Sequence, residues 1–131
     1  IVEEVEQNLF PTSQKEILYY LIAQCNRLDG NRLFLTTHSP YIVDYLTLAV
    51  KASSIYNASN NKEEVAKAMN DIVCKDAYID ADRLNIYQIT EEGEVMLLPM
   101  RGGLPSDSNY LNMSLAQTND MFNDLLDVED M

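Results

Sequence analysis

The sequence predicts an α/β fold, a partial sheet flanked by helices, with a β-hairpin and a last helix at its C-terminal end. Three observations support it. Two short apolar runs, at residues 1–2 and 33–35, enclose a segment of helical periodicity. Strand, helix and strand in this order are typical of a parallel sheet. Two further apolar runs enclose a turn that contains glycine, and an amphipathic segment follows them.

Composition limits the classes of protein that this chain can represent. Its 131 residues, 47% of them hydrophobic, suffice for one core. We expect no contact with a membrane, because no run approaches the 18 or more apolar residues of a membrane span. The sequence holds 9 Lys and Arg against 21 Asp and Glu, a net charge of −12. This charge argues against binding of a nucleic-acid backbone by this segment, so such a surface would lie in other regions of a parent protein.

Cys25 and Cys74 are the two cysteines of the chain. They are too few for a disulfide framework and lack the spacing of a paired metal motif. Both fall inside helical patterns, so we interpret them as buried, reduced thiols. Reduced thiols are typical of a cytoplasmic protein.

The first predicted helix covers residues 12–29. A capping box at residues 13–16 would start it and Gly30 would end it. Its apolar positions follow the 3.6-residue period: Ile17, Leu18, Leu21, Ile22, Cys25 and Leu28.

A strand at residues 32–37 and a second helix come next. Ser39 is a favourable N-cap, and Pro40 suits the first helical position. The predicted buried stripe of this helix is Ile42, Val43, Leu46, Ala49 and Val50.

The remaining elements divide into an insertion and a C-terminal part, after a core at residues 1–52. The insertion, residues 53–83, is predicted as a polar loop at 53–61 and a helix at 62–74, with Val65, Met69, Ile72 and Val73 on one face. Residues 84–131 are predicted as a hairpin of strands 84–89 and 94–99, a connection, a helix at 114–126 and an acidic tail. The face of this last helix expected to point inward carries Leu115, Phe122, Leu125 and Leu126.

The residues that carry chemistry follow the first two apolar runs. Glu3 and Glu4 end the first run, and His38, the only histidine, ends the second. Functional groups of parallel sheets gather at the carboxyl ends of the strands, so we expect these side chains on one rim.

This arrangement resembles the Walker B strand and switch histidine of ABC-type ATPases, in the branch that contains SMC, RecF and the overcoming-lysogenization-defect proteins. The likeness covers roughly the first 50 residues, from Glu3-Glu4 to Thr36-Thr37-His38-Ser39-Pro40. It departs from the usual pattern at Glu3, where Asp is common, at Val5, where Pro is common, and at Phe10, where many relatives have His.

The resemblance implies a role for each matching residue. Glu3 would hold Mg²⁺ through water, and Glu4 would act as the catalytic glutamate that orients the attacking water. His38 would donate a hydrogen bond to the γ-phosphate of ATP. Asn8 and Leu9 would form the loop that crosses to a partner subunit, which implies a homodimer through the nucleotide interface.

The other half of such a site is missing from this sequence. Phosphates are held by a glycine-rich loop ending in Gly-Lys-Ser/Thr, and no glycine here precedes Lys-Ser or Lys-Thr. The family's Leu-Ser-x-Gly signature is also absent. We therefore expect the C-terminal half of a P-loop ATPase domain, inactive alone, whose other half supplies the phosphate loop. The alternative is a non-catalytic interaction domain that retains the ATPase scaffold.

Two weaker patterns could suggest a metal site. Asp80 and Asp82 have the spacing of a Toprim metal site, but no strand precedes them. A zinc site from Glu3, Glu4, Glu6 and His38 lacks a thiol or a second histidine. Glu6 is open to two interpretations, a helix cap or a contact with the partner subunit. A sheet that is only partly contained in this sequence is also expected to leave an apolar patch, formed by Ile17, Leu21, Leu33 and Leu35. We expect this patch to be covered by self-association or by the rest of the same polypeptide.

Overall fold

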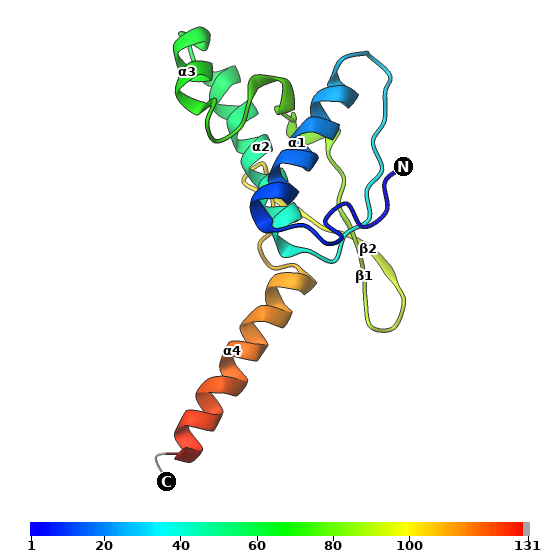
Figure 1. Cartoon of the computed structure of the whole chain (residues 1–131), viewed down its shortest axis with the longest axis vertical. Coiled ribbons are helices and arrows are strands. Elements are labelled where there is room, and N and C mark those ends of the chain that lie inside the picture. The colour runs from blue at the N-terminus through cyan, green and yellow to red at the C-terminus, as the bar shows by residue number, and fades with distance from the viewer. Residues whose placement is uncertain (130–131) are drawn as a thin grey trace.

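The computed structural model describes residues 1–129 as a mixed α/β arrangement of four α-helices and two small antiparallel sheets. Helices α1, α2 and α3 and the β1–β2 hairpin lie around the upper part of the molecule, and α4 extends away from them (Figure 1). The elements are α1 (Pro11–Asn26), α2 (Pro40–Ala58), α3 (Lys62–Met69), β1 (Tyr87–Ile89), β2 (Val95–Leu97), β3 (Met100–Arg101), β4 (Leu104–Pro105) and α4 (Tyr110–Glu129). Two short 3₁₀ turns, at Lys75–Ala77 and Ala81–Arg83, lie between α3 and β1.

The two N-terminal apolar runs pair in parallel, as predicted, but only through one bridge. Val2 pairs with Leu35; its amide donates to the carbonyl of Phe34 at 2.9 Å, and its carbonyl accepts from the amide of Thr36 at 3.0 Å. The mixed α/β class is as predicted, but within residues 1–129 both sheets are small and antiparallel, and the two runs add only this one parallel bridge. The reason is length, because the run at Ile1 and Val2 offers too few residues for a ladder.

Helix α1 begins at Pro11, with Phe10 as its N-cap, so the predicted capping box is wrong. Proline starts a helix well because its fixed φ is already helical and its missing N–H needs no partner there. Ser13 consequently lies inside the first turn. The helix ends at Asn26, before Gly30, whose φ of +89° belongs to the turn that follows.

Helices α1 and α2 form the centre of the core. The buried stripe predicted for α2 is confirmed, from Ile42 to Val50. The loop predicted at residues 53–61 is wrong, because α2 continues to Ala58 and crosses the predicted boundary at residue 52. Burial explains the extension: Ala52 and Ser53 face the core side, and the Ser53 hydroxyl donates to Asp80 Oδ1 at 2.5 Å. The cluster consists of Val5, Leu18, Tyr19, Ile22, Ile42, Leu46, Ala49, Ala52, Val73 and Ala77.

The helix predicted at residues 62–74 is shorter, since α3 ends at Met69. Val73 reaches the core from the turn beyond the helix, whereas Ile72 is exposed. The predicted hairpin is confirmed: β1 pairs with β2 antiparallel, with Gln88 opposite Met96. A second, two-residue hairpin of β3 and β4 occupies the connection that follows.

Helix α4 is longer than predicted, and its predicted inward face is exposed. Leu115, Phe122 and Leu125 have exposed fractions of 55%, 60% and 66%. Periodicity correctly indicated an amphipathic helix, but it carries no information about what covers the apolar side. Near its N-terminal end the helix is tied to the hairpin, where the Tyr110 amide donates to Gln88 Oε1 at 3.1 Å and its hydroxyl to Glu91 Oε1 at 2.7 Å.

The apolar patch expected next to the partial sheet is mostly covered by the core cluster of this chain. Ile17, Leu21, Leu33 and Leu35 are partly buried and pack against the core cluster. Cys25 and Cys74 are free thiols that are only partly buried. Within residues 1–129, none of the helices has the length and apolar character that crossing a membrane demands.

Candidate functional site

The parallel bridge brings two of the predicted site residues, Glu4 and His38, close together. Glu4 follows the first bridged segment and His38 the second, and Glu4 Oε1 lies 3.7 Å from His38 Nε2. Both side chains are accessible, with 84% of the His38 side chain and 47% of the Glu4 side chain exposed. An exposed pair of this kind adds little stability. Both groups are therefore available to a ligand.

The backbone at the site adopts an unusual conformation. Glu4 has a φ of 47° and Asn8 a φ of 60°, and no other non-glycine residue of 1–129 has a positive φ. Asparagine tolerates the left-handed region, but glutamate enters it at a cost of about 1 kcal/mol. The Glu4 amide is held by a hydrogen bond to Thr36 Oγ1 at 3.0 Å. Strain of this type clusters at functional positions.

Glu6 connects the N-terminal loop to the start of α2. Its Oε1 accepts a hydrogen bond from the His38 backbone amide at 2.6 Å, and its Oε2 is buried without a partner. The positive end of the α2 dipole favours a carboxylate at this point. The bond reaches the amide of His38, which precedes the N-cap Ser39, so Glu6 does not cap a first-turn amide of α2 but fixes the backbone that carries the His38 ring.

Ser39 occupies the predicted N-cap position of α2, but its side chain makes no cap bond. Its hydroxyl instead donates to Gln14 Oε1 at 2.6 Å, and Gln14 Nε2 donates to the Leu9 carbonyl at 3.0 Å. This chain of bonds fastens the loop before α1 to the start of α2. Thr36, Gln14 and Ser39 thus hold the segments that carry the site. Thr36 and Ser39 belong to the Thr-Thr-His-Ser-Pro motif, whereas Gln14 lies outside it.

The other predicted site residues lie near this pair without joining it. Glu3, Asn8 and Leu9 are exposed on the same loop. Among residues 1–129, no three side chains of His, Cys, Asp or Glu gather closely enough to hold a metal. Magnesium in nucleotide sites is held by one or two carboxylates together with phosphate oxygens and water, so exposed Glu3 and Glu4 fit that chemistry only when a nucleotide supplies the remaining ligands.

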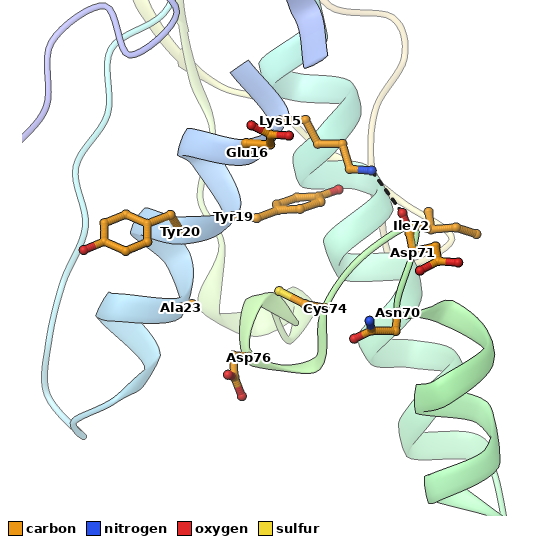
Figure 2. Close-up of a pocket in the computed structure, with 10 residues that line it drawn as sticks. All are labelled: Lys15, Glu16, Tyr19, Tyr20, Ala23, Asn70, Asp71, Ile72, Cys74 and Asp76. Atoms are coloured by element: carbon orange, nitrogen blue, oxygen red, sulfur yellow. Dashed lines mark hydrogen bonds between the residues drawn. The ribbon is translucent and has the colours of Figure 1, made fainter. Parts of the chain in front are cut away.

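A hollow lies apart from this pair, between α1 and the turn after α3 (Figure 2). Tyr19 and Cys74 lie on its inner side, Tyr20 points away from them, and Lys15 Nζ donates to the Asp71 carbonyl at 3.3 Å. The pKa of Tyr19 is raised, mainly by burial of its hydroxyl and to a smaller extent by the nearby Tyr45. The Tyr19 hydroxyl donates a hydrogen bond to the Tyr45 carbonyl at 3.1 Å. The polar groups here serve packing, and none of the predicted site residues lines the hollow.

Asp80 has a structural role rather than a metal-binding one. Its Oδ1 accepts hydrogen bonds from the Ser53 hydroxyl and from Asn57 Nδ2, the latter at 3.1 Å. Both donors lie on α2, so the carboxylate fastens the segment after α3 to that helix.

No protein-family model, curated protein or solved structure matches this chain.

Proposed function

We propose that this chain forms the Walker B and switch-histidine half of an ABC-type site that binds and hydrolyses ATP. The observation that carries the proposal is the pairing of Val2 with Leu35. It places the Glu4 carboxylate 3.7 Å from the His38 ring, at the carboxyl ends of two parallel segments.

The arrangement suits the chemistry of phosphoryl transfer. Hydrolysis needs an acceptor to orient water, a metal to neutralise charge and a donor for the γ-phosphate. Glu4 is the acceptor and the His38 imidazole is the donor, and Glu3 would be the residue that holds Mg²⁺. When bound, the metal supplies charge neutralisation for the developing negative charge.

Backbone strain supports the same assignment. Left-handed Glu4 is unfavourable for folding, and the hydrogen bond from its amide to Thr36 Oγ1 maintains it. Glu6 fixes the His38 backbone in a similar way. Both site residues are therefore held by specific bonds even though their own side chains are exposed.

The groups that bind the phosphates must be supplied by a segment outside this chain. The chain has a net charge of −12 and no Gly-Lys-Ser/Thr loop, so it offers no strong site for triphosphate. We propose that the rest of an ATPase domain supplies the loop. A second subunit closes the site across Asn8 and Leu9, both of which are exposed.

A second candidate is a non-catalytic interaction domain on the same scaffold, favoured by the exposed apolar side of α4. The genomic sequence upstream of the codon for Ile1 discriminates the two. An in-frame Gly-Lys-Ser/Thr loop supports the ATPase, and an open reading frame without one supports the interaction domain.

Calorimetric titration of Mg-ATP into the purified chain tests whether the chain binds nucleotide without the phosphate loop. We expect no saturable heat in the micromolar range, because the affinity for phosphate depends on backbone amides and a lysine that this chain lacks. Saturable binding that disappears in Glu4→Gln would show that the chain holds nucleotide unaided, contrary to the proposal.

A further inference from the structure

Helix α4 carries an apolar stripe with the spacing of a coiled-coil seam. Residues at alternating intervals of four and three recur along one side: Leu111, Leu115, Thr118, Phe122 and Leu125. Figure 1 shows the helix standing away from the rest of the molecule. The bonds of Tyr110 to the hairpin hold its first turn, so the stripe is presented at a fixed place.

The borders of the stripe carry no charge, and the one charged residue on the stripe itself is Glu129, four residues after Leu125. One border consists of Asn112, Asn119 and Leu126, and the other of Ser114, Met121 and Val128. The carboxylates of Asp120, Asp124 and Asp127 fall on the opposite side of the helix. A basic partner docked on the stripe would not contact these carboxylates, so the charge pattern does not favour a basic partner.

Charge is also separated along the helix. Residues 110–119 carry none, whereas residues 120–129 carry three aspartates and Glu129 and no base. Two such helices in parallel would place their acidic halves side by side. In the antiparallel orientation each acidic half lies against an uncharged half and near the positive N-terminal end of the other helix.

We propose that α4 pairs antiparallel with α4 of a second copy of this chain, in a two-fold symmetric dimer. The seam places Leu115 opposite Leu125 of the second copy and Thr118 opposite its Phe122, a small side chain facing a large one. Glu129 then lies beside the first turn of the other helix. The pairing is independent of the proposed ATPase function.

The size of the face sets the expected affinity. Six exposed apolar side chains offer on the order of 100 Å² each, or roughly 600 Å² per copy, against about 800 Å² per partner in a standard interface. They are Leu115, Met121, Phe122, Leu125, Leu126 and Val128. We therefore expect a dissociation constant in the micromolar range.

Analytical ultracentrifugation of the 131-residue chain, from about 1 to about 100 μM, tests the pairing. We expect a monomer–dimer equilibrium that Phe122→Glu weakens at least about tenfold. Gln117→Glu adds the same charge away from the seam and should leave the equilibrium unchanged; circular dichroism checks that both variants keep the helix. A monomeric wild type, or a Phe122→Glu variant that still dimerises, overturns the proposal.

Oxidative cross-linking tests the orientation. Leu115→Cys and Leu125→Cys should each give no cross-link beyond that of the wild type with its two native cysteines. A mixture of the two variants should give a disulfide-linked dimer. Cross-linking of each variant with itself would show a parallel pair and contradict the antiparallel assignment.

Discussion

At the scale of single residues, the sequence predicted which groups meet but not what holds them. Glu4 and His38 were expected together because parallel strands end on one rim, and they lie 3.7 Å apart. The supporting bonds from the Glu4 amide to Thr36 and from the His38 amide to Glu6 were not predicted in detail. They depend on loop dihedral angles, and no periodicity reports these angles.

The left-handed backbone of Glu4 predicts an unusual mutational effect. Glu4→Gly should raise the free energy of unfolding by up to about 1 kcal/mol, because glycine enters this region without strain. Glu3→Gly, at the adjacent position without a positive φ, should lower it by about 0.5–1 kcal/mol. Urea denaturation of both variants provides the comparison. Equal destabilisation by the two changes would mean that the Glu4 backbone is unstrained.

Tyr19 predicts a dependence of stability on alkaline pH. Burial raises its pKa above the ordinary value of 10.0, so the folded chain keeps the proton that the unfolded chain releases. The stabilisation is complete below pH 10 and is lost as the pH rises further, by up to about 1.4 kcal/mol per pH unit. Tyr19→Phe should flatten this decline between about pH 10 and about pH 11. Exposed Tyr20→Phe is the matched control, and a decline that stays unchanged in Tyr19→Phe would contradict the assignment.

At the scale of elements, periodicity identified the four helices and the hairpin, while their ends followed local chemistry. Proline moved the start of α1 to Pro11. Burial of Ala52 and Ser53 carried α2 through a segment whose Asn and Ser content indicated a loop. Tertiary contact overrides weak propensity at such positions.

The α1–α2 contact predicts a large difference between two identical substitutions. Leu18→Ala should lower the free energy of unfolding by about 2–5 kcal/mol, because Leu18 is fully buried between the helices. Leu48→Ala, on the exposed side of α2, should cost less than about 1 kcal/mol. Chemical denaturation followed by circular dichroism measures both. Similar losses would show that the core lies elsewhere.

At the scale of the whole molecule, the mixed α/β class was predictable, but the extent of the sheet was not. One parallel bridge lies where a larger part of a sheet was expected, because the two apolar residues of the first run are too few for a ladder. The exposed side of α4 has a similar explanation: the sequence specifies an apolar face, but it does not specify which surface that face packs against.

The most direct test of the central claim is the ATP turnover of the complete polypeptide encoded by the gene that contains this chain. Glu4→Gln should lower turnover by on the order of 10² or more while ATP binding remains, because the carboxylate acts mainly in the transition state. Glu3→Gln should instead shift the Mg²⁺ dependence. Wild-type turnover in Glu4→Gln, or equal small effects of both changes, would contradict the assignment of this loop to ATP hydrolysis.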